Sequence, residues 1–213
     1  MYNTLSDIPW NTCIQGDARE VLRDFPASTF DLCITSPPYF NLRNYGGDSR
    51  EVGQEKTQVE FISNLMLLFD EVWNKLKPTG SLWVNIGETF VRGPLHIPDD
   101  FLRIMTTIAD WHHMQTVIWF KPDPQPESAQ RRFSQTWEPF FWFVKDYDSY
   151  YFNIEASKIA VKKNTINRLY YKFNTSAQTA VSRMRGIVEN MEHKVDDFLT
   201  KGVNAGDLWI IYQ

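Results

Sequence analysis

An apolar run that ends abruptly in Ser-Pro-Pro-Tyr constrains this chain more than any other feature. Residues 30–35 are mainly apolar and precede two consecutive prolines, a pattern typical of a buried strand that leads into a rigid turn. Prolines fix φ and lack an N–H donor, so the strand must end there. The carbonyl groups of Ser36 and Pro37 are then left to accept hydrogen bonds from a ligand. Tyr39 adds a flat ring with a polar tip, which suits stacking on a base that carries an amino group.

Three further stretches flank this turn, at residues 14–18, 76–87 and 118–122. In this order they resemble the successive motifs of the amino DNA methyltransferases, whose catalytic motif has the form (Ser/Asp/Asn)-Pro-Pro-(Tyr/Phe). Pro-Pro-Tyr alone also occurs in ordinary turns and in proline-rich ligands, so the flanking motifs carry the resemblance. It covers residues 1–155 and matches the family branch in which the catalytic motif comes first.

The resemblance implies a catalytic turn made of Ser36, Pro37, Pro38 and Tyr39. The target base would leave the duplex and stack on Tyr39, while Ser36 and the Pro37 carbonyl accept hydrogen bonds from its amino group. S-adenosylmethionine is the implied methyl donor and double-stranded DNA the implied partner. Serine in the first position favours cytosine N4 over adenine N6. The implied protein is a site-specific DNA methyltransferase of a restriction-modification or related system.

The predicted cofactor-binding residues are Asp17, Thr35, Asn85 and Glu88. Asp17 matches the acidic position near the adenine of S-adenosylmethionine in the family, and it is equally well placed to cap the helix that follows. Asn85 and Glu88 follow a predicted strand at the carboxyl edge, where open α/β sheets bind ligands. Thr35 ends the strand before the catalytic turn.

Predicted DNA contacts fall in two places. Arg43, Trp119 and Lys121 occupy stretches that border the target base in the family, although a loop arginine is often simply solvated and Trp119 also suits an ordinary core. Residues 157–188 contain seven basic and no acidic residues, interleaved with Tyr, Asn and Gln side chains. That pattern favours phosphate and base contacts, with a solvated helical face as the alternative. The DNA-binding candidates there are Lys162, Lys163, Arg168, Lys172, Arg183 and Arg185.

Periodicity and turn residues predict an alternating α/β chain. The expected strands are 11–15, 30–35, 81–86, 114–120, 138–144 and 206–212, and the expected helices are 18–23, 57–76, 98–112 and 189–200. Lys77-Pro78-Thr79-Gly80 is expected to form a turn. The predicted domains are a catalytic subdomain (1–155), a basic target-recognition region (156–202) and a final strand (203–213).

The resemblance also implies a Rossmann-like class I methyltransferase sheet of order 3-2-1-4-5-7-6, from which this chain lacks strands 1 and 2. Its Asp-Pro-Phe-x-Gly-x-Gly cofactor segment is not in the sequence. We therefore expect the edge of the 30–35 strand to stay open, which promotes association. A second polypeptide, a second copy or residues 206–212 would cover it, and the chain alone would transfer no methyl group. The alternative function is a non-catalytic DNA-binding module or subunit derived from such an enzyme.

Composition limits the remaining possibilities. A chain of 213 residues with 43% hydrophobic content can build a core, and a net charge of −4 gives no general attraction to DNA. Cys13 and Cys33 lie inside predicted buried strands, which indicates a reducing compartment. The four histidines lack the spacing of metal ligands. We expect a soluble cytoplasmic protein without a metal or a membrane segment.

Overall fold

The computed structural model describes residues 2, 4–46, 50–124, 127–159, 203–204 and 208–210. The chain divides into two units. The first comprises Met1–Tyr151 with Asp207–Gln213, and the second comprises Phe152–Gly206.

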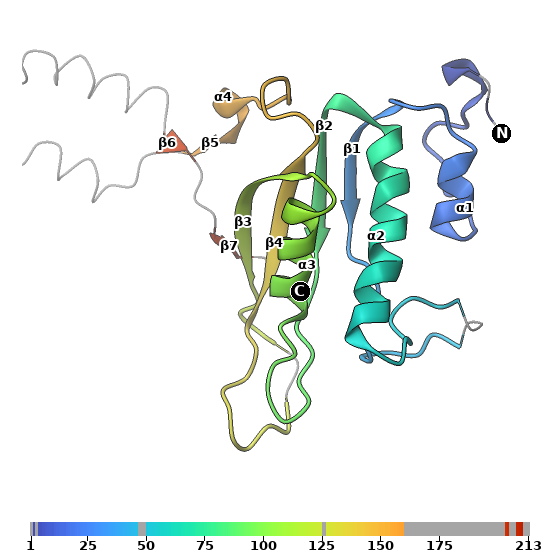
Figure 1. Cartoon of the computed structure of the whole chain (residues 1–213). Coiled ribbons are helices and arrows are strands. Elements are labelled where there is room, and N and C mark those ends of the chain that lie inside the picture. Colours follow the sequence, from blue (N-terminus) through green and yellow to red (C-terminus); the bar gives the residue numbers. More distant parts are fainter. Residues whose placement is uncertain are drawn as a thin grey trace, which may run out of the picture. The chain divides into compact units, whose positions relative to one another are not determined.

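The first unit is built on a five-stranded sheet of order β1-β2-β4-β3-β7 (Figure 1). The strands are β1 (Phe30–Thr35), β2 (Leu76–Asn85), β3 (His112–Phe120), β4 (Trp137–Val144) and β7 (Leu208–Ile210). β1 runs parallel to β2 and β3 runs parallel to β7, whereas β4 is antiparallel to both β2 and β3. The order β1-β2-β4-β3 reproduces the 4-5-7-6 part of the expected sheet, so the predicted α/β fold class is confirmed.

Helices α2 (Gln58–Lys75) and α3 (Ile97–Thr107) provide the apolar side chains that pack on the sheet, and α1 (Ala18–Arg23) packs beside α2. The Thr57 hydroxyl accepts a hydrogen bond from the Glu60 amide, and the Glu60 carboxylate accepts one from the Thr57 amide, so a capping box begins α2. The core is one cluster whose fully buried members include Phe61, Leu65, Phe69, Leu82, Val84, Phe101 and Phe143. No helix within the described ranges is long and apolar enough to cross a membrane.

The second unit contains α4 (Ile154–Ser157) and a short antiparallel pair, β5 (Lys158–Ile159) with β6 (Val203–Asn204). The predicted helix at 189–200 and the basic side chains from Lys162 to Arg185 lie outside the described residues.

Three local predictions are wrong. Residues 11–15 form no strand, and Cys13 is exposed rather than buried. Residues 77–80 belong to β2, although the register jumps there from Phe30–Leu76 to Leu32–Ser81, so they bulge from the ladder with β1. Helix α3 ends at Thr107 instead of residue 112, because Asp110 adopts a left-handed φ of 60° that reverses the chain into β3.

Strand β1 lies at an edge of the sheet and pairs only with β2 among the described residues. Cys33 packs against the core, and its burial raises the thiol pKa to about 11. The alternate side chains, Leu32 and Ile34, are 49% and 63% exposed. β7 pairs with β3 at the opposite edge, so residues 208–210 do not cover β1. Within the described ranges, no strand pairs with the outer edge of β1.

Candidate active site

The predicted catalytic turn follows β1 at the edge where β2 also ends, because the two strands are parallel. It lines an open cavity of about 710 Å³. The loop after β2 and the loop between β3 and β4 form the opposite wall, and Figure 1 shows both extending beyond the end of the sheet. Of the predicted site residues, those that line the cavity are Ser36, Pro37, Pro38, Tyr39, Arg43, Asn85, Glu88, Trp119 and Lys121.

The Tyr39 ring is held by a close packing contact and by its hydroxyl group. A Cβ atom added to Gly87 would lie 2.6 Å from Cδ2 of Tyr39 and closer still to Cε2, so only glycine leaves room for the ring. The hydroxyl oxygen lies 2.6 Å from Oδ1 of Asn85 and 2.9 Å from Oε2 of Glu138. Burial, supplemented by the charge of Glu138, raises the pKa of Tyr39 far above its ordinary value, so the hydroxyl stays protonated.

Ser36 and Asn85 complete the polar side of this network. The Ser36 hydroxyl is exposed and lies 3.4 Å from Asn85 Oδ1 and 3.5 Å from the Tyr39 hydroxyl, both long contacts. Asn85 is 1% exposed, and its Nδ2 donates to the Pro139 carbonyl at 3.1 Å. The Asn85 amide is therefore engaged on both sides by the protein, whereas the Ser36 hydroxyl can readily exchange its contacts for those of a ligand.

Glu138 on β4 is a site residue that the sequence analysis missed. One of its carboxylate oxygens contacts Tyr39, and the other forms an ion pair with Lys121, which also lies over the Trp119 ring, 5.0 Å from its centroid. Glu138 therefore ties the catalytic turn to the stretch around Trp119 and Lys121. The Trp119 indole nitrogen is buried and has no hydrogen-bond partner among the described residues.

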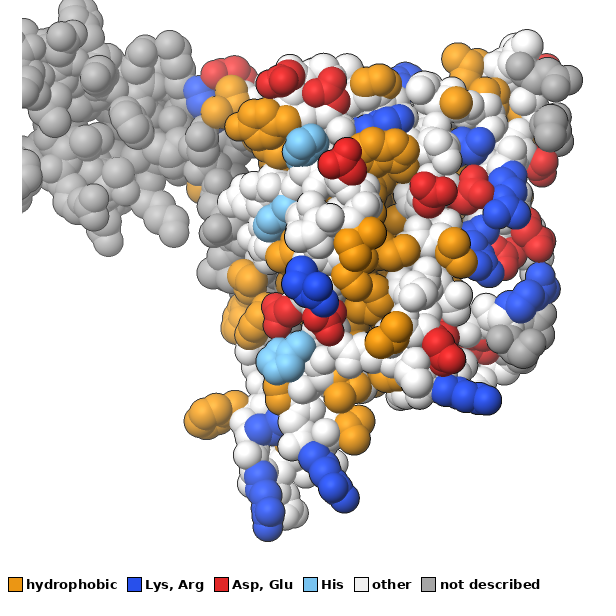
Figure 2. Space-filling model, in the orientation of Figure 1, with side chains coloured by type: hydrophobic (Ala, Val, Ile, Leu, Met, Phe, Trp, Pro, Cys, Tyr) orange, Lys and Arg blue, Asp and Glu red, His pale blue; other side chains and the backbone are white. Residues whose placement is uncertain are grey.

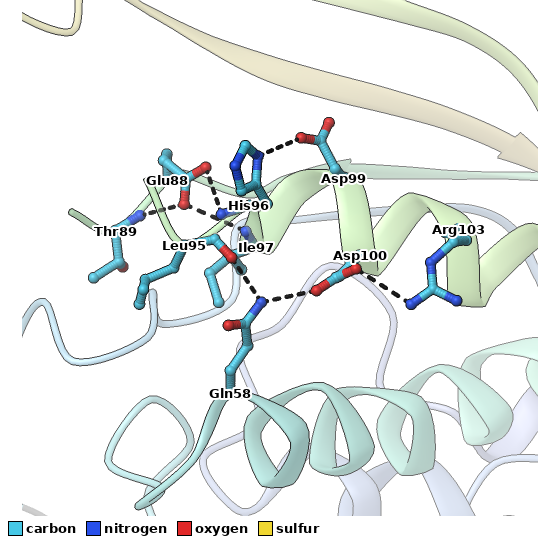
Figure 3. Close-up of polar contacts among 9 residues, drawn as sticks. All are labelled: Gln58, Glu88, Thr89, Leu95, His96, Ile97, Asp99, Asp100 and Arg103. Atoms are coloured by element: carbon cyan, nitrogen blue, oxygen red, sulfur yellow. Dashed lines mark hydrogen bonds and ion pairs between the residues drawn. The ribbon is translucent and has the colours of Figure 1, made fainter. Parts of the chain in front are cut away.

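Glu88 organises the loop that leads into α3 (Figure 3). Its carboxylate accepts hydrogen bonds from the backbone amides of Thr89, His96 and Ile97, at 2.9, 3.0 and 3.3 Å. Below it, Gln58 bridges α2 to this loop by donating to the Leu95 carbonyl and to Asp100. Both Glu88 oxygens are thus used to hold the cavity wall and the start of α3.

The other two predicted cofactor residues, Asp17 and Thr35, are not among the residues that line this cavity. Asp17 caps α1 by accepting a hydrogen bond from the Arg19 amide at 2.9 Å, as its position before the helix indicated. Within the part of the chain that the structure describes, no three His, Cys, Asp or Glu side chains gather as metal ligands.

This sheet order and a Ser-Pro-Pro-Tyr turn at its carboxyl edge define a class I methyltransferase fold of the amino-methylating type. The DNA methylase family model (N6_N4_Mtase) matches residues 30–212. The chain belongs to this DNA methylase family.

Individual relatives agree with this assignment. The type II methyltransferase M.Cfr9I of Citrobacter freundii is 30% identical over 68% of this chain and 57% of its own length. M.SmaI of Serratia marcescens is 31% identical over 68% of this chain and 59% of its own. The chain therefore spans less than two thirds of the length of these relatives.

Solved structures support the fold. The PvuII DNA methyltransferase, which is cytosine-N4-specific, superposes with a TM-score of 0.55 over 93% of this chain and 79% of its own, at 17% identity. A DNA modification methylase from Thermus thermophilus, complexed with S-adenosyl-L-methionine, gives a TM-score of 0.50 over 73% of this chain and 64% of its own, at 24% identity.

Proposed function

We propose that this chain is the catalytic and DNA-recognition part of an S-adenosylmethionine-dependent DNA methyltransferase that modifies an exocyclic amino group. The observation that carries the proposal is the Ser36–Tyr39 turn at the rim of the cavity, with an exposed serine hydroxyl beside an anchored tyrosine ring. Serine at the first position of the turn favours cytosine N4 over adenine N6 as the target.

The turn would hold the target base in an orientation ready for reaction. The Tyr39 ring packs closely against Gly87 and lines the cavity, where it would stack on a flipped base. The Ser36 oxygen and the Pro37 carbonyl accept hydrogen bonds from the amino group and keep its nitrogen lone pair aimed at the incoming methyl carbon. Positioning and electrostatic stabilisation are the contributions that such a transfer needs from the protein.

S-adenosylmethionine would supply a methyl group on a sulfonium sulfur. When bound, it would offer this methyl carbon to the base nitrogen and leave as a neutral thioether, while Ser36 and the Pro37 carbonyl hold the amino group, whose proton would pass to water. The described residues fit the base better than they fit this donor. Asn85 and Glu88, the two predicted cofactor residues in the cavity wall, are already engaged by protein groups. Other groups must therefore hold most of the methyl donor.

A second polypeptide that carries the glycine-rich segment and pairs with β1 would supply those groups, whereas a second copy of this chain would only cover the edge. The edge of β1 adjoins the catalytic turn, and Leu32 and Ile34 present apolar surface beside it. A strand added to this edge would pair with the β1 backbone and build a further wall of the donor site. Contacts with double-stranded DNA would come from Arg43 and Lys121 at the cavity and from the basic region at 157–188.

A non-catalytic DNA-binding subunit is the second candidate, and the engagement of Asn85 and Glu88 by protein groups favours it. Photo-crosslinking of tritiated S-adenosylmethionine in the presence of DNA separates the two. The methyltransferase proposal predicts label in the protein once β1 is paired with a partner polypeptide that carries the glycine-rich segment. DNA binding without label in any such assembly would favour the subunit instead.

A further inference from the structure

The side chain of Phe133, on the loop between β3 and β4, is almost fully exposed to solvent. It is 98% exposed, the highest value among the large apolar side chains in the described residues. A single exposed apolar side chain is ordinary on protein surfaces. What distinguishes Phe133 is how the surrounding residues 127–136 are held, and where they lie.

The residues on both sides of Phe133 are fixed by polar contacts. Glu127 forms a 2.5 Å ion pair with Arg132, and its other oxygen accepts a hydrogen bond from the Gln135 amide at 3.3 Å. Arg132 also donates to the Phe133 carbonyl at 3.0 Å, and its guanidinium carbon lies 3.9 Å from the centroid of the Phe90 ring. Glu127 therefore links two positions of the loop, and the contact between Arg132 and Phe90 holds it against the neighbouring loop. The Phe133 ring remains exposed to solvent.

The loop stands at the rim of the cavity that contains the catalytic turn. Glu127, Arg132 and Gln135 all line that cavity, so Phe133 directly follows a residue of its wall. Arg92 and Arg131 on the same two loops are exposed and have no acidic partner within the described ranges. Figure 2 shows Lys and Arg side chains gathered at the tip of the projection that these loops form. The projection thus combines positive charge with an exposed aromatic ring.

We propose that this loop enters the DNA and that Phe133 inserts into the base stack at the place vacated by the extruded target base. The inference rests on the proposed function and names the part of the protein that opens the duplex. Extrusion of a base leaves a gap whose neighbours have lost their stacking, and an inserted apolar ring restores part of it. Such a ring must sit beside the cavity that receives the base, as Phe133 does. Arg92 and Arg131 bind the flanking phosphates.

The test measures DNA binding without a methyl donor. An abasic site provides the gap in advance, so the wild-type protein should bind a duplex with one abasic site about tenfold more tightly than the intact duplex. Phe133→Ala should lose this preference and keep the salt dependence of binding, because no charge is removed. Phe133→Trp should retain the preference. Arg131→Ala should weaken binding to both duplexes and lower the salt slope.

Ile108→Ala provides the matched control, because Ile108 is 75% exposed at the end of α3 and does not line the cavity. It should behave as wild type. A Phe133→Ala protein with the wild-type preference for abasic DNA would overturn the inference even if the protein methylates DNA. Loss of the preference in a protein that never methylates DNA would support insertion and count against the proposed function alone.

Discussion

The hydroxyl oxygen of Tyr39 lies 2.9 Å from a carboxylate oxygen of Glu138, 99 residues further along the chain. The other carboxylate oxygen is paired with Lys121. This contact joins the turn after β1 to β4 and fixes the angle of the ring that is proposed to receive the base. The hydroxyl group serves as an anchor, and the ring remains the binding surface.

Because the hydroxyl group anchors Tyr39 and the ring is the binding surface, two substitutions of Tyr39 should have different effects. Tyr39→Phe should remove the anchor and keep the stacking surface, whereas Tyr39→Ala should also weaken capture of the flipped base by about 1–3 kcal/mol. Ser36→Ala should leave DNA affinity unchanged and slow methyl transfer, because it removes an orienting contact only. Fluorescence anisotropy and transfer rates measured on the same active assembly check this. Wild-type values for all three variants would rule out the mechanism.

Gly87→Ala should displace the Tyr39 ring. The new methyl group would lie within 2.6 Å of the ring, and forcing it in should cost about 1–3 kcal/mol of stability. Gly93→Ala in the same loop is the control, because a Cβ atom there would meet no atom within 4 Å. The melting temperature and the DNA affinity should fall in Gly87→Ala and stay at the wild-type values in Gly93→Ala. Identical behaviour of the two variants would mean that the ring does not rest on Gly87.

The two cysteines should differ sharply in alkylation by iodoacetamide at pH 8. Cys13 is exposed, whereas burial raises the pKa of the Cys33 thiol to about 11. The reactive thiolate of Cys33 is then about a thousandth of the total at pH 8, and it grows only as the pH rises toward the pKa. Mass spectrometry of peptides should find Cys13 labelled first. Equal labelling rates in the native protein would contradict the packing of β1 on the core.

The open edge at β1 should make the protein self-associate. Ile34 is 63% exposed on that strand, and Ile34→Lys should shift the protein toward the monomer, because charge beside an edge strand opposes pairing. Ile108→Lys changes a more exposed apolar side chain, 75% accessible at the end of α3, and should have no such effect. Sedimentation velocity over a range of concentrations compares them. A wild-type protein that stays monomeric at all concentrations would refute the expectation.

Local sequence patterns predicted the helices and strands that carry their own signals. The apolar spacing of α2 identifies that helix without any tertiary information, and the structure adds a capping box at Thr57. Residues 11–15 have strand composition but form none, because a strand needs a neighbour that composition cannot reveal. Pro78 indicated a turn, yet it lies in the bulged start of β2, which no β4 residue pairs, so its missing N–H costs nothing.

The catalytic turn was predictable because its residues are contiguous, whereas the residues that position it are not. Glu138 reaches Tyr39 across a sheet whose middle strands are not consecutive in the chain, and no local motif marks it. Gly87 was noticed only as part of a strand end, and its role follows from the place of the Tyr39 ring. Conversely, Glu88 was predicted to bind the cofactor from its place at the carboxyl edge, but its backbone contacts emerge only once α3 is in place.

The most direct test of the central claim is transfer of tritiated methyl groups from S-adenosylmethionine to DNA, followed by identification of the labelled nucleoside. We expect no transfer by this chain alone, because the glycine-rich segment that binds the donor in this family is not in its sequence. We expect N4-methylcytosine when the chain is co-expressed with a polypeptide that carries the glycine-rich segment, and loss of that product in Ser36→Ala. Undiminished methylation by Ser36→Ala, or efficient methylation by the unaccompanied monomer, would contradict this claim.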